Sequence, residues 1–162
     1  MAQHTDFIYT HELPAPLSKV WDAWTNEENL GQWWGPSGYD LGVKEFNLQP
    51  EGFFHYSMSA NGGPKMWGKF VFKEIQPTSR LVFVNSFSDE EGNLLRAPFS
   101  ATWPIEMLNE VTFEEKDGNT LMTLAGRPHN ATHAEEQTYA DGHASMQQGF
   151  AGTFKKLEEF LK

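Results

Sequence analysis

The sequence predicts an α+β fold: a curved antiparallel sheet of six to seven strands, two short helices near the N-terminus and one long C-terminal helix over the sheet. Three observations lead to this prediction. Apolar residues recur at helical spacing in two early segments, strand-like segments separated by turn signals follow up to residue 127, and helical spacing returns after Pro128. A curved sheet wrapped around a helix encloses a cavity unless large side chains fill it.

The first part of the chain is predicted to hold one strand and two short helices. Alternating positions in TDFIYTHEL (residues 5–13) indicate a strand. The next segment begins with prolines and then shows the i, i+3, i+4, i+7 spacing of an amphipathic helix at Leu17, Val20, Trp21 and Trp24. A capping box of Thr25 and Glu28 would begin the second helix, which ends at Gly35-Pro36. Its apolar face carries Leu30, Trp33 and Trp34.

Six further strands are predicted before the C-terminal helix, each ending at a turn signal. The clearest turn is Asp117-Gly118, because Asp-Gly between two strand patterns is a strong hairpin signal. The predicted strands span residues 42–48, 53–60, 66–75, 80–88, 105–115 and 119–127.

One long helix is predicted from Thr132 to the C-terminus, with a capping box of Thr132 and Glu135 at its start. Gly142, Gly149 and Gly152 would each cost about 1 kcal/mol relative to alanine. They predict either the close approach of another segment or a loosely held helix. The apolar positions of this helix are Tyr139, His143, Met146, Phe150, Phe154 or Thr153, Leu157 and Leu161.

Composition restricts the classes of function. The 162 residues are predicted to form a single domain (1–162) that buries about 68–70% of its unfolded surface. The chain has no cysteine, which excludes disulfides, thiolate catalysis and zinc sites with sulfur ligands. Its net charge of −10 argues against nucleic acid as a partner. With no run of about 18 apolar residues and no recognisable signal peptide, we expect no membrane insertion and a cytoplasmic location.

Aromatic residues make up 14% of the chain, and four of the six tryptophans lie between residues 20 and 36. These rings either pack an ordinary core or line a hollow interior that accepts a guest. Strand alternation points Asn85 inward among phenylalanines, where it needs a ligand, a bound water or a backbone group as hydrogen-bond partner. Methionines would adapt the cavity to its guest. The candidate ligand-binding residues are Trp33, Trp34, Phe54, Tyr56, Met58, Met66, Phe83, Asn85, Phe87, Trp103, Met107, His143, Met146 and Phe150.

Signals for catalysis and metal binding are sparse. His143 is a candidate general base, ligand anchor or core histidine, but the sequence places no carboxylate to orient it. His129 and His133 are four residues apart without a third metal ligand. Arg96 and Arg127 could each hold a ligand's carboxylate or pair with surface glutamates. No phosphate-binding loop, nucleophile elbow or dinucleotide motif occurs, so we expect no cofactor and no metal.

Three stretches of the chain resemble a known family. The first runs from Pro16 to Pro36 and reads V-W-x-A-W-T and then L-x-x-W-W-G-P. The second comprises Pro50, Gly52, Phe54, Tyr56, Met58, Gly68, Ile75, Pro77, Leu81, Val82 and Phe83. The third comprises Gly142, Met146, Gly149 and Phe150, where the family usually has Gly-Trp. Over essentially its whole length the chain resembles the START-like (SRPBCC) superfamily, and within it the domain similar to the C-terminal part of the activator of heat-shock protein 90 ATPase.

The resemblance implies the helix-grip fold, with Trp33 and Trp34 near the mouth of its cavity. Many stand-alone members resemble binders of small hydrophobic molecules, and some relatives are polyketide cyclases. The eukaryotic activator has a separate N-terminal domain that contributes to chaperone binding, for which these 162 residues leave no room. We therefore expect a small hydrophobic partner, lipid-like or polycyclic. The alternatives are a cyclase or hydrolase acting on such a guest, and a stress-related co-chaperone of a heat-shock protein 90 type ATPase.

Overall fold

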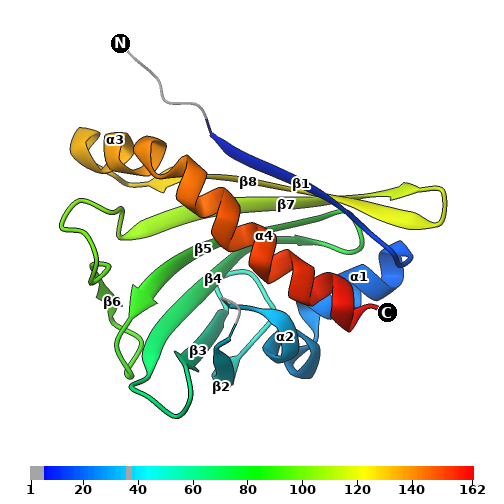
Figure 1. The fold of residues 1–162 in the computed structure, drawn as a ribbon, viewed down its shortest axis with the longest axis horizontal. Coiled ribbons are helices and arrows are strands. Elements are labelled where there is room, and N and C mark those ends of the chain that lie inside the picture. Colours follow the sequence, from blue (N-terminus) through cyan, green and yellow to red (C-terminus); the bar gives the residue numbers. More distant parts are fainter. Residues whose placement is uncertain (1–5, 36–37) are drawn as a thin grey trace.

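The computed structural model describes residues 6–35 and 38–162 and confirms the predicted α+β architecture (Figure 1). The strands are β1 (Phe7–Leu13), β2 (Asp40–Phe46), β3 (Phe53–Ser59), β4 (Met66–Gln76), β5 (Arg80–Ser88), β6 (Leu94–Leu95), β7 (Glu106–Lys116) and β8 (Asn119–His129). The helices are α1 (Leu17–Thr25), α2 (Glu27–Trp33), α3 (His133–Asp141) and α4 (His143–Phe160). Two predicted positions lie outside the described residues, namely Thr5 in the first strand and Pro36 after the second helix.

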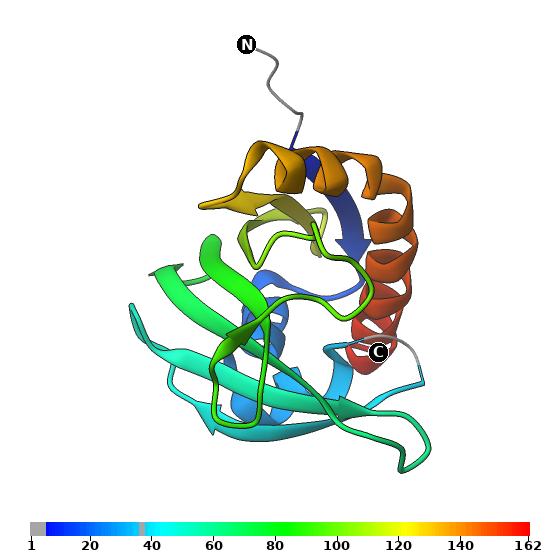
Figure 2. The same cartoon turned by 90° about the vertical axis from the view of Figure 1, so that its left-hand side faces the viewer.

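All strands belong to one antiparallel sheet with the order β1-β8-β7-β5-β4-β3-β2, and the two-residue strand β6 pairs with β5. The seven longer strands match the upper number predicted. Register shifts between Val43 and Glu45 and between Phe72 and Glu74 mark irregularities of the bulge type, which bend a strand. The sheet therefore curves, and α4 packs along its concave side (Figure 2).

Local sequence signals explain most of the element boundaries. Asp117 and Gly118 both have positive φ, at 52° and 85°, as the predicted two-residue hairpin between β7 and β8 requires. The capping box of Thr132 and Glu135 is confirmed at the start of α3. The predicted box at Thr25 is wrong, because Asn26 caps α2 while the Thr25 hydroxyl donates back into α1. Thr25 is thus the last residue of the first helix.

The prediction of a single C-terminal helix is wrong, since the chain divides at Gly142 into α3 and α4. A Cβ at this position would lie 3.0 Å from Cζ3 of Trp103. The Trp103 indole therefore occupies the space that a side chain at residue 142 would need. Glycine, which has no side chain, allows this close approach. The break lets α4 leave the line of α3 and cross the concave face of the sheet (Figure 1).

The core lies between this concave face and the helices, and tryptophans dominate it. Trp24 is fully buried, and its ring centroid lies 4.7 Å from that of Trp33. Trp33 is also fully buried, and its Nε1 donates to the carbonyl of Ala23 at 2.9 Å. The Trp24 Nε1 finds no acceptor among the described residues. Core packing therefore accounts for two of the four clustered tryptophans.

Two of the three glycines of the C-terminal region, Gly142 and Gly149, should respond oppositely to alanine. Gly149→Ala is expected to raise the free energy of unfolding by about 0.5–1 kcal/mol, because a Cβ there meets no atom within 4 Å and alanine favours the helix. Gly142→Ala should lower it, because residue 142 caps both helices, where alanine has no advantage over glycine, and its Cβ would contact Trp103. Urea unfolding of both variants measures the difference, and a destabilising Gly149→Ala would contradict the open position of residue 149.

Candidate ligand-binding site

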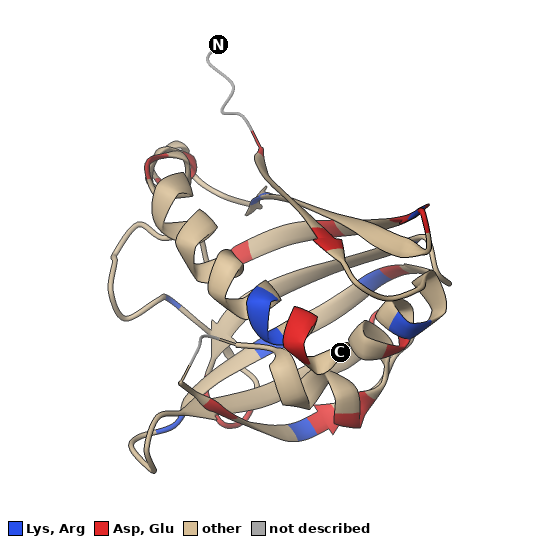
Figure 3. Ribbon diagram, turned by 45° about the vertical axis from the view of Figure 1, so that its right-hand side comes forward, with Lys and Arg blue, Asp and Glu red and all other residues tan. Residues whose placement is uncertain are grey.

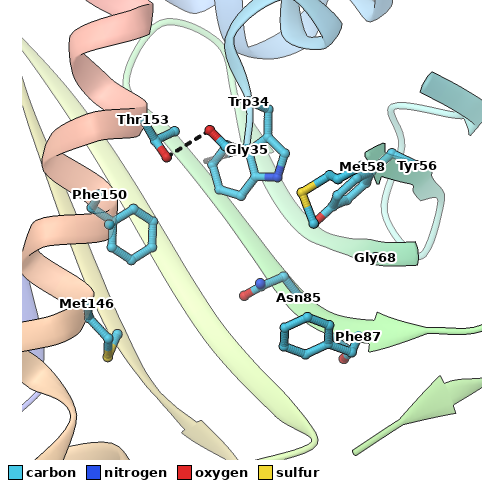
Figure 4. Close-up of a pocket in the computed structure, with 12 residues that line it drawn as sticks. Trp34, Gly35, Tyr56, Met58, Gly68, Asn85, Phe87, Met146, Phe150 and Thr153 are labelled. Carbon is cyan, nitrogen blue, oxygen red and sulfur yellow. Dashed lines mark hydrogen bonds between the residues drawn. The ribbon is translucent and has the colours of Figure 1, made fainter. Parts of the chain in front are cut away.

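A cavity of about 240 Å³ lies between α4 and the strands β3, β4 and β5 (Figure 4). From α4, the lining residues follow the i, i+3, i+4, i+7 spacing of one helix face: Met146, Gly149, Phe150 and Thr153. The sheet contributes Tyr56, Met58, Gly68, Asn85, Ser86 and Phe87. Trp34 and Gly35, which directly follow α2, complete the wall. The cavity is thus the predicted space between the curved sheet and the covering helix.

The wall of this cavity carries no formal charge, since none of its twelve residues is Asp, Glu, Lys or Arg. The charged residues of α4, the helix that covers the cavity, are confined to one end of the helix. All four charged residues of α4 lie in its last six positions: Lys155, Lys156, Glu158 and Glu159 (Figure 3). An unpaired charge on a guest would therefore lose its hydration without gaining an ionic partner from the wall. The cavity favours a neutral molecule.

Seven of the fourteen candidate residues line the cavity: Trp34, Tyr56, Met58, Asn85, Phe87, Met146 and Phe150. The inward orientation of the four strand residues follows from strand alternation, and that of Met146 and Phe150 from the helical spacing of α4. In Figure 4 the Phe150 and Met146 side chains point from α4 toward the strand that carries Asn85 and Phe87.

The other seven candidates lie outside this wall, for three physical reasons. Four are covered by core neighbours, namely Trp33, Phe54, Phe83 and Met107. Two line separate hollows: Met66 lies in a groove near β6, and Trp103 lies beside the α3–α4 break. His143 is held between aromatic rings, with its ring centroid 5.5 Å from those of both Phe7 and Tyr139.

Five lining residues were not among the candidates: Gly35, Gly68, Ser86, Gly149 and Thr153. Three of them are glycines, which contribute no side chain and therefore no hydrophobic periodicity. One sequence signal could have found Gly149 and Thr153, because they stand three and seven residues after Met146 on the same helix face. Nothing comparable marks Ser86, which stands between two inward positions.

Asn85 finds its hydrogen-bond partner in a side chain that the sequence analysis did not consider. The Nδ2 group of Asn109 donates to Oδ1 of Asn85 at 2.5 Å. The same Nδ2 lies 3.5 Å from the carbonyl oxygen of Met107, which fixes the orientation of the Asn109 amide because two oxygens would repel each other there. The side-chain oxygen of Asn85 therefore already accepts a hydrogen bond from within the protein.

Tyr56 is the second polar group of the sheet side, and burial raises its pKa to about 12. The neighbouring Trp34 side chain opposes this rise in the pKa. The ring lies across Gly68, where a Cβ would stand 2.5 Å from the hydroxyl oxygen. Glycine at position 68 therefore lets the Tyr56 hydroxyl extend along the sheet toward β5, the strand of Asn85.

His143 does not have the surroundings of a general base. Its Nε2 is buried and has no hydrogen-bond partner among the described residues, so no carboxylate orients the ring. Within residues 6–35 and 38–162, no three His, Asp or Glu side chains gather as metal ligands. Arg96 pairs with Glu135, and Arg127 pairs with Asp6 at 3.2 Å. Both arginines are thus engaged away from the cavity.

The match to a family covers almost the whole chain. The family described as Activator of Hsp90 ATPase homolog 1-like protein (AHSA1) has a model that matches residues 14–162. The chain belongs to this family. Within the described residues of this AHSA1-like protein, no helix has the length and apolar character needed to cross a membrane.

Solved structures resemble the AHSA1-like chain in fold. Protein Ms6760 from Mycobacterium smegmatis is 24% identical with a TM-score of 0.74, over 96% of this chain and 89% of that chain. A protein from Arthrobacter aurescens is 24% identical with a TM-score of 0.79, over 98% and 86% of the two chains. DynU16, from the dynemicin biosynthetic locus, is 18% identical with a TM-score of 0.65, over 98% and 48%. A comparison with curated proteins finds no significant match.

Proposed function

We propose that this AHSA1-like protein binds a small, neutral and mostly apolar molecule in the cavity between α4 and strands β3 to β5. The observation that carries the proposal is the wall itself, which joins aromatic rings and two methionines with a few polar groups and no charge. Ligand sites of this kind usually combine apolar walls with a small number of placed polar groups. The volume of about 240 Å³ is just below the usual ~300–1,000 Å³, so the guest is small, of the order of a few fused rings.

Two further considerations support a binding role. DynU16, a structural neighbour, belongs to a biosynthetic locus for a small molecule, dynemicin. The cavity wall contains no pair of side chains that could act as general acid and general base, because its titratable member is Tyr56 and burial keeps that hydroxyl protonated. Binding without turnover is therefore the function that we propose.

Titration calorimetry with the tricyclic hydrocarbon derivative 9-fluorenone tests this function. We expect saturable binding to the wild-type protein and at least a tenfold weaker affinity for Gly149→Leu, whose side chain would enter the cavity from α4. Leucine also favours the helix over glycine, so the melting temperature should not fall.

The matched control for this experiment is Gln148→Leu. Residue 148 is exposed and stands outside the face of α4 that lines the cavity, because that face follows the i, i+3, i+4, i+7 spacing from Met146. It should leave the affinity unchanged. No binding of any tricyclic probe would contradict the proposal and favour a surface interaction with a chaperone. Chemical conversion of the probe during incubation, detected by chromatography, would instead favour an enzymatic function.

A further inference from the structure

Among the polar side chains on the sheet side of the cavity, Asn85 has its acceptor atom engaged by the protein. Asn109 Nδ2 donates to Oδ1 of Asn85, which leaves the Nδ2 group of this cavity-lining residue as a donor. An amide nitrogen carries two hydrogens and accepts none. No partner for this nitrogen occurs among the described residues. Figure 4 shows the Asn85 amide directed into the open space between Phe87 and Phe150.

Tyr56 supplies a second donor. Its hydroxyl belongs to a cavity-lining residue, and burial raises its pKa, so the hydroxyl keeps its hydrogen. No acceptor for this hydrogen occurs in the described part of the chain. The Asn85 amide and the Tyr56 hydroxyl are thus two donors in a mostly apolar wall.

The other polar atoms of the wall do not offset this pattern. The backbone carbonyl of Gly35 accepts from Thr153 Oγ1 at 3.1 Å and from Lys156 Nζ at 3.3 Å. Thr153 therefore uses its hydroxyl hydrogen within the protein and retains only a weak acceptor, on the helix side of the cavity. A donating group on a guest would find only hydroxyl oxygens as acceptors, on Tyr56, Ser86 and Thr153, whereas an accepting group would find the Asn85 amide, which can only donate, beside the Tyr56 hydroxyl.

We propose that the guest carries a neutral hydrogen-bond acceptor, such as a ketone or quinone carbonyl oxygen, which Tyr56 and Asn85 hold by donation. The proposal rests on the proposed function and narrows its ligand class. A carboxylate is disfavoured because no cationic side chain lines the cavity. An amine is less favoured because the amide oxygen of Asn85 is engaged by Asn109 and the wall offers an amine only hydroxyl oxygens. An aromatic ketone combines the flat apolar body that suits Trp34 and Phe150 with a single oxygen for the donors.

Three probes with the same ring skeleton test this inference: fluorene, 9-fluorenone and 2-aminofluorene. In the wild-type protein we expect 9-fluorenone to bind about tenfold more tightly than fluorene, as one or two net hydrogen bonds would give. The amine should bind no more tightly than fluorene. The carbonyl stretching band of bound 9-fluorenone should move to lower wavenumber, which reports directly on donation to its oxygen.

Two nearly isosteric variants assign the donors. Tyr56→Phe removes one donor and retains the ring. Asn85→Asp retains an oxygen toward Asn109 but replaces the donating nitrogen by a second oxygen. Each should reduce the preference for 9-fluorenone over fluorene and shift its carbonyl band back. The ratio of the two affinities is the measured quantity, so a general weakening of the cavity does not imitate the result. If Asn85→Asp does not fold, the affinity ratio of Tyr56→Phe still tests the inference.

The outcomes separate the two proposals. Equal binding of fluorene and 9-fluorenone would overturn the donor inference and leave the apolar binding function intact. A preference that survives both substitutions would overturn the assignment to Tyr56 and Asn85. Tight binding of 2-aminofluorene would show that the cavity accepts rather than donates. Failure of all three probes to bind would overturn the proposed function together with this inference.

Discussion

Replacement of Trp24 by alanine is expected to lower the free energy of unfolding by about 3–5 kcal/mol. The side chain is fully buried and contacts the rings of Trp33, Trp34, Phe83, Phe113 and Phe154, which come from helices and strands on both sides of the core. Its loss would leave a large void that these rings fill only in part. Since small domains have total stabilities of about 5–15 kcal/mol, denaturant unfolding at equilibrium should show the change clearly.

A matched pair of phenylalanine variants separates volume from hydrogen bonding. Trp24→Phe and Trp33→Phe remove the same atoms from fully buried positions, but only Trp33 donates its Nε1 hydrogen, to Ala23. Trp33→Phe should therefore be the more destabilising by about 1 kcal/mol or more, because Trp24→Phe also removes a buried donor that lacks a partner. A larger loss for Trp24→Phe would contradict the hydrogen-bond assignment.

Alkaline pH should destabilise the protein through its buried tyrosines. Burial raises the pKa of Tyr56 to about 12 from its ordinary value of 10.0, and it also raises that of Tyr139, near the carboxylate of Asp6. A raised pKa means that the folded state binds the proton more tightly than the unfolded state. The stabilisation is therefore complete below pH 10 and is lost as the pH rises to 12. Two pH units correspond to about 3 kcal/mol for Tyr56 alone.

Denaturant midpoints measured from pH 9 to pH 12 test this expectation. Tyr56→Phe serves as the control, because it lacks this titration while its lysines and other tyrosines are unchanged. The wild-type protein should lose stability more steeply than the variant over this range. Parallel curves for the two proteins would show that Tyr56 ionises normally, and hence that its hydroxyl is not buried as the structure places it.

Much of the fold could be predicted from interactions between residues that are close together in the sequence. The hairpin at Asp117-Gly118 and the box at Thr132 depend on backbone conformation and hydrogen bonds within a few residues, and both were found. The break at Gly142 could not be predicted in the same way. It depends on Trp103, which reaches this position from a loop before β7, and the helical periodicity continues on both sides of it.

The site was predictable to the extent that inward-facing side chains recur at every second residue of a strand and every three or four residues of a helix. Tyr56, Asn85 and Met146 were placed on inward faces for that reason, and they line the cavity. Periodicity does not tell a deep inward position from a shallow one. Phe83 belongs to the same inward set as Asn85, but the Phe70 ring stacks on it at 4.1 Å between centroids and it belongs to the core. The engagement of Asn85 by Asn109 depends on pairing between β5 and β7 and could not be inferred from either strand alone.

The pairing of β1 with β8 has a consequence for how the protein is made. Phe7 pairs with Gly126, so β1 leaves the ribosome more than a hundred residues before its partner strand β8. Translation at about 5–20 residues per second makes this a delay of several seconds. During that time Phe7 and Leu13, both buried in the finished protein, remain open to solvent, to chaperones or to other nascent chains. β1 therefore joins the sheet only after all the other strands have been synthesised.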